Sequence, residues 1–321
     1  MNCQGKCTPG LGKSRSIRHN LPQFPAFASL TLMNPLIQDL LSQGAVLTDG
    51  AWGTQMQARG LGIGEFPDLW NLSHPEQVLA VARSYVDAGS RVILTNTFGA
   101  NRIRLAEAGA VDRLLEINRE GVRISKEAAG GKAKVFASVG PSGKMLMSGE
   151  VTPEELLEAY AEQALALAAA GADALVLETL ADLDEAKLAV EAAKRTGLPL
   201  VASIVFDSGK DKDRTMMGST PEQVAEELAA AGVDVIGANC GLGIEFFAPI
   251  CRRLRAAGGL PVWIKPNAGM PEMVAGQTVY KTGADTFACQ VPALVEAGAS
   301  FVGACCGSTP DFIRTVSQVL R

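Results

Sequence analysis

Residues 297–306 of this chain have the sequence Ala-Gly-Ala-Ser-Phe-Val-Gly-Ala-Cys-Cys. The Ala-Gly pair is typical of a helix end, because glycine adopts the left-handed conformation that caps a helix. The apolar residues that follow have the pattern of a strand covered on both faces. We therefore predict a strand over 300–306 that begins after Gly298 and ends in the adjacent thiols Cys305 and Cys306.

The same arrangement occurs at three earlier places, where an Ala-Gly pair precedes an apolar run. These pairs occupy 88–89, 170–171 and 231–232. Counting seven and eight residues on from each of the four glycines gives Asn96-Thr97, Glu178-Thr179, Asn239-Cys240 and Cys305-Cys306. The polar or thiol pairs therefore lie at the same depth, at the C-terminal ends of their strands.

Eight β-rich runs alternate with helical stretches rich in Ala, Leu and Glu. This alternation indicates a parallel sheet with helices on its outside, and eight strands favour a closed (β/α)8 TIM barrel over a doubly wound sheet. Barrels of this kind carry their active sites at the C-terminal rim of the strands. The runs are 45–48, 91–97, 134–140, 172–179, 200–206, 233–240, 262–267 and 300–306.

The composition is that of a globular protein, with 321 residues, 47% hydrophobic and 20% charged. A net charge of −5 argues against nucleic acid or an anionic membrane as the main partner. Gly and Asp interrupt the apolar stretches before they could span a bilayer, which predicts no membrane insertion. The seven cysteines are odd in number and unlike a disulfide framework. We therefore expect a reducing, cytoplasmic location.

The N-terminus differs from the rest of the chain. Residues 1–38 contain no acidic residue, and the first 32 carry four basic residues together with Cys3 and Cys7. We predict that residues 1–34 are a disordered N-terminal extension and that 35–321 form a single barrel domain. A transit peptide, or a translation start placed upstream of Met33, are the alternatives.

Cys240, Cys305 and Cys306 are candidate metal ligands. Thiolates favour zinc, and the strand ends that carry them face one barrel mouth. Neighbours on an ideal strand point to opposite faces, so the strand must end between Cys305 and Cys306, and Gly307 allows that turn. The alternative is that all three are small buried hydrophobic residues. Their matched depth favours zinc.

A zinc ion with three thiolates is a poor Lewis acid for making hydroxide. It suits binding and deprotonating an incoming thiol, whose sulfur stays nucleophilic near neutral pH. This chemistry points to S-alkylation of a thiol rather than hydrolysis. It needs no general base, which agrees with a chain that contains two histidines. We therefore predict no catalytic residue beyond the zinc site.

Other polar residues near the rim are candidate substrate ligands. Asp49 and Glu178 could hold an ammonium group, and backbone amides near Gly140 could take a carboxylate. Asn267 could supply an oxygen to the vacant zinc position. Each rim acid has the alternative role of a loop cap or salt bridge. The predicted substrate-binding set is Asp49, Gly50, Thr97, Gly140, Glu178 and Asn267.

Taken together, these motifs resemble the homocysteine S-methyltransferase family, which includes betaine–homocysteine methyltransferase and the homocysteine-binding module of cobalamin-dependent methionine synthase. The resemblance covers about residues 35–321. It implies a (β/α)8 barrel with zinc on Cys240, Cys305 and Cys306, the homocysteine sulfur on the metal, and the amino-acid end held by Asp49, Glu178 and nearby backbone. The motifs are Asp49-Gly-Ala-Trp-Gly-Thr54, Thr95-Asn-Thr-Phe98, Gly140-Pro-Ser-Gly143, Glu178-Thr179, Gly237-Ala-Asn-Cys-Gly241, Pro266-Asn-Ala-Gly269 and Gly303-Ala-Cys-Cys-Gly-Ser-Thr-Pro310.

The spacing around Thr215 and Asn267 is closer to the methionine-synthase module than to the betaine enzyme. No folate or cobalamin module follows the barrel, so we expect a small free methyl donor or a separate corrinoid protein. No clear aromatic cage for a quaternary ammonium donor is visible, and Trp52 and Trp70 are the nearest candidates. The predicted function is zinc-dependent methyl transfer to homocysteine, which forms methionine. The alternatives are another thiol acceptor, a corrinoid-protein partner, or a non-catalytic zinc-binding barrel.

Overall fold

The computed structural model describes residues 33–320, apart from 275 and 276. The predicted extension, residues 1–34, lies outside the described residues except for its last two. From Asn34 onward the chain forms one compact unit. Among the described residues, no helix is both long and apolar enough to cross a membrane.

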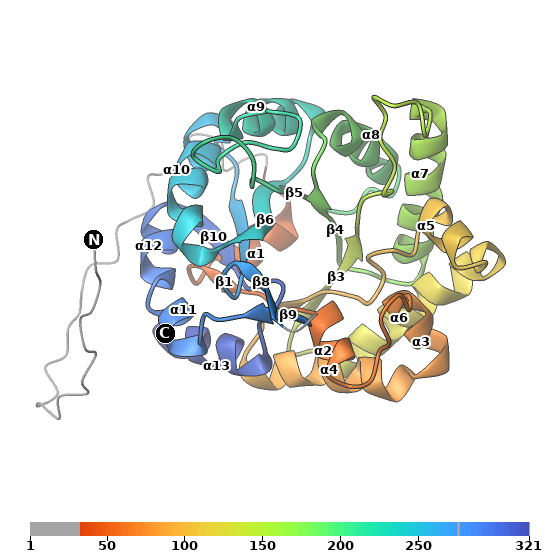
Figure 1. The fold of residues 1–321 in the computed structure, drawn as a ribbon, viewed down its shortest axis with the longest axis horizontal. Coiled ribbons are helices and arrows are strands. Elements are labelled where there is room, and N and C mark those ends of the chain that lie inside the picture. The colour runs from red at the N-terminus through yellow and green to blue at the C-terminus, as the bar shows by residue number, and fades with distance from the viewer. Residues whose placement is uncertain (1–32, 275–276, 321) are drawn as a thin grey trace, which may run out of the picture. The chain divides into compact units, whose positions relative to one another are not determined.

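Eight parallel strands form a barrel, which confirms the predicted fold class (Figure 1). Their order around the sheet is β1-β10-β7-β6-β5-β4-β3-β2. The register is parallel at every pairing between neighbours in this order. The strands are β1 (Val46–Leu47), β2 (Val92–Ile93), β3 (Lys134–Val139), β4 (Ala174–Leu180), β5 (Leu200–Ile204), β6 (Val235–Gly243), β7 (Val262–Asn267) and β10 (Ala299–Val302).

The gap between β1 and β2 is closed by individual hydrogen bonds, and we call this junction the seam. One backbone bond crosses it, from Arg91 N to the Leu47 carbonyl at 2.8 Å. Two side chains complete it: Ser90 Oγ donates to the Thr48 carbonyl at 3.2 Å, and Asp49 Oδ2 accepts from Leu94 N at 2.8 Å. The ring is therefore complete without a ladder at this position.

Helices surround the barrel, as Figure 1 shows. Thr152 and Thr220 form the capping boxes that start α7 and α9. The four glycines of the repeat have φ between 90° and 106°, as a left-handed helix cap requires. The helices are α1 (Pro35–Leu41), α2 (Gly53–Gln57), α3 (Trp70–Ser73), α4 (Pro75–Ala88), α5 (Arg102–Glu107), α6 (Leu114–Ala129), α7 (Pro153–Ala169), α8 (Leu183–Lys194), α9 (Pro221–Ala231), α10 (Phe247–Gly258), α11 (Ala284–Ala288), α12 (Val291–Glu296) and α13 (Pro310–Val319), with short 3₁₀ turns η2 (Pro67–Leu69), η3 (Val111–Arg113) and η4 (Ile244–Phe246).

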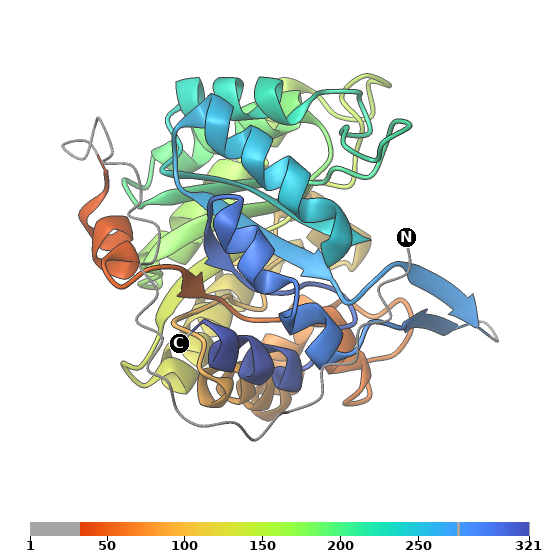
Figure 2. The ribbon, with the colours of Figure 1, turned by 90° about the vertical axis from the view of Figure 1, so that its left-hand side faces the viewer.

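A two-stranded antiparallel hairpin follows β7 and was not predicted from the sequence. It consists of β8 (Pro271–Val274) and β9 (Gln277–Tyr280) and projects from the barrel body (Figure 2). All four residues of β8 are exposed, so the segment lacks the apolar alternation that marks a strand in a sequence.

Aromatic side chains fill the barrel interior below the rim. The ring of Trp263 on β7 lies 6.2 Å from that of Phe136 on β3 and 5.4 Å from that of Phe301 on β10. All three side chains are fully buried. Because alternate residues of a strand face the same way, the inward position of Trp263 also turns Lys265 inward, one step closer to the rim.

Candidate active site

The three predicted metal ligands meet at the C-terminal rim. The sulfur atoms of Cys240, Cys305 and Cys306 all lie within 4.8 Å of one another. Cys306 Sγ is 3.9 Å from each of the other two sulfurs. They form the one such cluster of potential metal ligands found in the described part of the chain. The structure thus brings together the three thiols that the sequence placed at one barrel mouth, and their role as metal ligands stays a prediction.

The backbone reaches this arrangement in a different way from the one predicted. β10 ends at Val302, so the strand does not end between Cys305 and Cys306, and both cysteines lie in the turn that follows. A residue in a turn is not bound to the alternating directions of a strand, so two adjacent thiols can face one point. The neighbouring segment holds this turn: Cys305 N donates to the Pro266 carbonyl at 2.7 Å, and Ala268 N donates to the Cys306 carbonyl at 2.9 Å.

Cys240 lies at a kink in β6, with φ of 61°. Thr179, the matching residue of the repeat on β4, has φ of 62°. Asn239 ties the two kinks together, because its Nδ2 donates to Thr179 Oγ1 at 2.7 Å and its Oδ1 accepts from Thr179 N at 3.0 Å. Left-handed backbone is costly for residues with a Cβ and is concentrated at functional sites. Here it turns Cys240 toward the other thiols.

Burial and the contacts among the three thiols raise the pKa of Cys240 and of Cys306. The hydrogen bond with Cys305 lowers the pKa of Cys240, but the bond with Cys306, burial and the Cys306 charge raise it to about 12. The pKa of Cys306 is also raised to about 12. Three thiols this close repel one another as thiolates, so a bound cation would stabilise the deprotonated cluster.

The cluster fits a zinc ion. Zinc binds thiolate sulfur at about 2.3 Å in tetrahedral geometry, which places ligand sulfurs about 3.8 Å apart. The two 3.9 Å separations around Cys306 match that spacing. Three ligands from the protein leave a fourth position for a substrate atom, as in catalytic rather than structural zinc sites.

A cavity of about 410 Å³ opens beside the sulfurs. Two of the six predicted substrate residues, Gly50 and Glu178, line it, together with all three cysteines. Glu178 is 7% exposed, and its Oε1 accepts a hydrogen bond from Ser138 Oγ at 2.5 Å. Burial raises the pKa of this carboxyl, although the positive charge of Lys265 and the Ser138 hydrogen bond oppose the shift.

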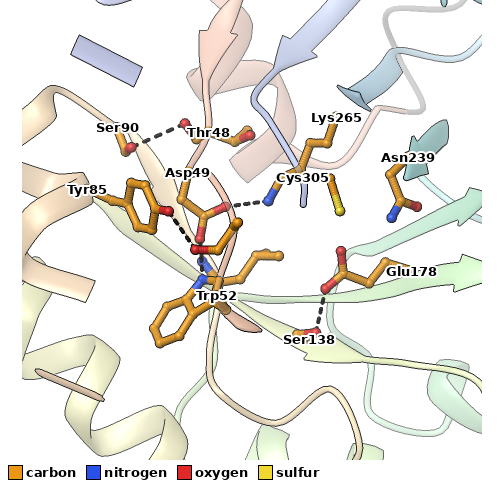
Figure 3. A network of polar contacts seen from close by, with 12 residues as sticks. Thr48, Asp49, Trp52, Tyr85, Ser90, Ser138, Glu178, Asn239, Lys265 and Cys305 are labelled. Carbon is orange, nitrogen blue, oxygen red and sulfur yellow. Dashed lines mark hydrogen bonds and ion pairs between the residues drawn. The ribbon is translucent and has the colours of Figure 1, made fainter. Parts of the chain in front are cut away.

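Lys265 lines the floor of the cavity and forms a buried ion pair, with Asp49 behind it, that sequence reasoning missed. Lys265 Nζ lies 2.5 Å from Asp49 Oδ1, and the two side chains are 3% and 0% exposed. Asp49 Oδ2 accepts from Trp52 Nε1 at 2.7 Å and from Leu94 N at 2.8 Å. Figure 3 shows Glu178 across from this pair and Cys305 beside Lys265. We call Asp49, Lys265 and Glu178 the ionic floor.

The other four predicted substrate residues do not line the cavity. Asp49 is bonded to three protein donors, Thr97 Oγ1 donates to the Ser138 carbonyl at 2.7 Å, and Gly140 N donates to the Phe98 carbonyl at 2.8 Å. Asn267 is 3% exposed, and its Oδ1 is buried without a hydrogen-bond partner. Direct contact of these four residues with a substrate stays a prediction.

Away from the thiols, the cavity has an aromatic and acidic part that was also missed. Trp52, Phe66 and Phe98 line it, and Trp70 does not. Asp68 lines it too and is 3% exposed, with Oδ1 accepting from Gly99 N at 2.9 Å. Burial raises the pKa of Asp68 to about 6.

The sequence offered a way to detect Lys265 as a site residue, but none to detect Asp68. Lys265 interrupts an otherwise apolar run, Val262-Trp-Ile-Lys-Pro-Asn267, at a position that alternation with Trp263 turns inward. A charged residue inside a strand covered on both faces is therefore detectable. Asp68 stands between Pro67 and Leu69 in a loop, where an acid is ordinary, and no pattern marked it.

Comparison with known proteins decides the family. A model of the homocysteine S-methyltransferase family matches residues 46–320. The chain belongs to the homocysteine S-methyltransferase family. The predicted resemblance to this family is confirmed.

Two curated members of this family are methionine synthases. The chain is 32% identical over 301 residues to the methionine synthase of Mycobacterium tuberculosis and 30% identical over 301 residues to that of Mycobacterium leprae. Each alignment covers 88% of this chain and 25% of the relative. The chain thus spans about a quarter of the length of these relatives.

A solved structure of the family has the same fold. The homocysteine methyltransferase MmuM from Escherichia coli, in its metallated form, matches with a TM-score of 0.74 and 25% identity. That match covers 89% of this chain and 99% of MmuM. The oxidized form of MmuM matches the fold with a TM-score of 0.73 at 23% identity.

Proposed function

We propose that this protein is a zinc-dependent homocysteine S-methyltransferase that transfers a methyl group to the thiol of homocysteine and forms methionine. The single observation that carries the proposal is the cluster of three cysteine sulfurs, within 4.8 Å of one another, at the wall of a cavity of about 410 Å³. A member of this family with such a cluster can bind a metal and a thiol at the same point. MmuM, a structural relative, is known in a metallated form.

Cys240, Cys305 and Cys306 would hold the metal in this proposal. When bound, zinc supplies a fourth position that takes up a substrate sulfur and lowers its pKa, so that the thiolate forms near neutral pH. The turn after β10 and the kink at Cys240 fix the ligand sulfurs before substrate arrives. Asn267, whose Oδ1 lacks a partner, belongs to the segment that hydrogen-bonds both cysteines of the turn. This supports its role as an oxygen near the vacant position.

Glu178 would bind the substrate ammonium. Its carboxylate is buried at the cavity wall, makes no ion pair with a described residue and accepts a side-chain hydrogen bond from Ser138. A buried carboxylate needs a cation or further donors, and an α-ammonium supplies both. Substrate positioning by such contacts brings the sulfur and the methyl carbon into line, which can account for much of the rate enhancement.

The methyl donor would enter through the part of the cavity lined by Trp52, Phe66, Phe98 and Asp68. Arg104 already stacks on Phe66, but the faces of Trp52 and Phe98, with the Asp68 carboxyl on the same cavity, would attract a methylated cation such as a sulfonium or quaternary ammonium. This favours a small cationic donor over a corrinoid protein. A cytoplasmic location belongs to the same proposal, because Cys240, Cys305 and Cys306 form no disulfide and the chemistry requires them reduced.

The experiment combines metal analysis, X-ray absorption and a donor panel. Purified protein should contain about one zinc per chain, and homocysteine should replace an oxygen or nitrogen neighbour of the zinc with a fourth sulfur. The donors are S-methylmethionine, betaine, S-adenosylmethionine, methylcobalamin and methyltetrahydrofolate, with methionine as the measured product. An unchanged metal shell together with no methionine from any donor would contradict the proposal and favour the non-catalytic barrel.

A further inference from the structure

Lys265 has hydrogen-bonding capacity that the protein does not use. An ammonium group carries three N–H donors. Among the described residues, Asp49 Oδ1 is the one acceptor within hydrogen-bond distance of Lys265 Nζ. Lys265 is 3% exposed and lines the cavity beside the thiols. Because unsatisfied donors on a buried charge are costly, the remaining N–H groups call for an acceptor inside the cavity.

The placement of Lys265 suits the end of a substrate whose sulfur lies at the thiol cluster. Pro266, the next residue, accepts the hydrogen bond from Cys305 N at 2.7 Å, so β7 runs beside the cysteine turn. Figure 3 shows the Glu178 carboxylate opposite the Lys265 ammonium group, which lies beside Asp49. No ion pair joins these two side chains, which leaves a positive and a negative group separated at one cavity wall.

The donors that the sequence suggested for a carboxylate are already occupied. Gly140 N donates to the Phe98 carbonyl at 2.8 Å, and Ser142 N donates to Glu185 Oε1 at 2.8 Å. Neither residue lines the cavity. Arg104 does line it but pairs with Glu107 at 2.6 Å and stacks on Phe66, in the part that contains Asp68. Lys265 is the cationic side chain nearest the thiols along the described cavity wall.

We propose that Lys265 binds the carboxylate of the thiol substrate while Glu178 binds its ammonium, so that the ionic floor selects α-amino-acid thiols. The two groups then match the two charges of the zwitterion. Asp49 is a positioning residue in this arrangement, because its bonds to Trp52 and Leu94 fix the acid that orients Lys265. The inference rests on the proposed function for the presence of a thiol at the cluster, and it assigns the group that recognises the other end.

The test uses three thiols with the zinc-loaded full-length protein. Homocysteine has both charges, 4-mercaptobutyrate lacks the ammonium, and 3-mercaptopropylamine lacks the carboxylate. Affinity is measured by isothermal titration calorimetry, and methyl transfer is followed separately with the donor panel. Binding therefore reports on charge recognition even for a preparation that transfers no methyl group.

The variant is Lys265→Met combined with Asp49→Asn, because removing Lys265 alone would leave a buried unpaired carboxylate and could prevent folding. The matched control, Lys187→Met with Asp184→Asn, neutralises an exposed ion pair on α8. Circular dichroism and zinc content verify that both proteins are folded and loaded. We expect the Lys265 variant to lose tenfold to a hundredfold in affinity for homocysteine and 4-mercaptobutyrate, with less than a threefold change for 3-mercaptopropylamine.

Equal weakening of all three thiols would overturn the inference, because it would show a structural role for the ion pair. So would unchanged affinity for the two carboxylates, or a wild-type protein that binds none of the thiols. Selective loss of carboxylate binding supports it, whether or not methionine is formed. Failure of methyl transfer with selective binding intact would instead count against the proposed function alone.

Discussion

The thiol cluster and the ionic floor border the same cavity, but their buried groups are balanced in different ways. The cluster consists of three thiols, and burial together with their mutual contacts raises the pKa of Cys240 and of Cys306 to about 12, so its deprotonation calls for a bound cation. The ionic floor contains its own cation, with Lys265 paired to Asp49 at 2.5 Å. The thiol cluster therefore depends on an added ion to balance its charge, whereas the ionic floor gains its balancing charge when the chain folds.

This difference separates two tasks within one site. A metal centre must exchange ligands during a reaction, so its fourth position stays open. A recognition element must be rigid, and the Asp49–Lys265 pair is fixed by hydrogen bonds from Trp52 and Leu94. We expect substitutions on the thiol side to abolish metal and activity together. Substitutions on the ionic side should change affinity while the metal stays bound.

The largest effect is expected from breaking the thiol cluster. Cys306→Ala should reduce zinc from about one per chain to below a tenth and slow methyl transfer more than about a thousandfold, because two ligands cannot hold a catalytic zinc. Elemental analysis and methionine formation measure both quantities. Cys289→Ser is the control, since Cys289 is exposed and outside the cluster. Active protein without metal would refute the mechanism.

The next effect concerns Asp68, a buried acid whose raised pKa the charge of Arg104 only partly offsets. Burial raises the pKa of Asp68 from 3.8 to about 6. Between these values the native carboxyl binds more protons than the unfolded one, so the free energy of unfolding falls as pH rises through this window. The loss is about 3 kcal/mol for a shift of this size.

Urea unfolding of the wild type and Asp68→Asn at pH 4 to 7 measures this contribution. The variant keeps an oxygen for Gly99 N but cannot ionise, so its stability should fall less over the window. Parallel profiles for the two proteins would show that Asp68 does not titrate in this way.

A smaller effect is expected on the recognition side of the comparison. Glu178→Gln keeps an acceptor for Ser138 but removes the charge, and we expect KM for homocysteine to rise tenfold to a hundredfold, or about 1.4 to 2.8 kcal/mol. Zinc content should remain at the wild-type value. Steady-state kinetics with metal analysis measures both, and exposed Glu191→Gln serves as the control. Loss of zinc in the Glu178 variant would contradict the separation of metal binding from substrate recognition.

The smallest effect tests how the cysteine turn is supported. Gly307 and Gly44 both have left-handed φ, 80° and 99°, so alanine strains the backbone at either position. A Cβ at Gly307 would meet the Tyr280 ring, whereas one at Gly44 has no neighbour within 4 Å. We expect Gly307→Ala to lower the free energy of unfolding by roughly 1 kcal/mol more than Gly44→Ala. Equal losses in chemical denaturation would mean that the turn adapts freely.

The sequence predicted the barrel and the thiol side well, for physical reasons. Runs such as 262–267, recovered as β7 with the same bounds, begin with bulky apolar residues and are buried throughout, and therefore carry a strong pattern. Cysteine has distinctive chemistry, so Cys240 and the adjacent pair were visible without knowledge of contacts. The hairpin formed by β8 and β9 escaped because its first strand is wholly exposed.

The ionic floor was only partly predictable. Asp49 and Glu178 were recognised as rim acids, but the ion pair joins residues 216 positions apart and exists because the barrel places β7 near Asp49, two residues after the end of β1. Residue types alone do not say which acid is neutralised within the protein and which is left for a ligand. That assignment depends on side-chain directions that appear only once the ring closes.

The seam between β1 and β2 has a consequence for motion. A junction held by one described backbone bond and two side chains opens at lower cost than a full ladder. Asp49 couples this junction to the cavity, because its carboxylate accepts the hydrogen bond from Leu94 N across the seam and also pairs with Lys265. A ligand bound to Lys265 would therefore stabilise the hydrogen bond between Leu94 N and Asp49 and keep the seam closed. Amide hydrogen exchange at Leu94 should slow when homocysteine binds, which makes this one N–H a reporter of site occupancy.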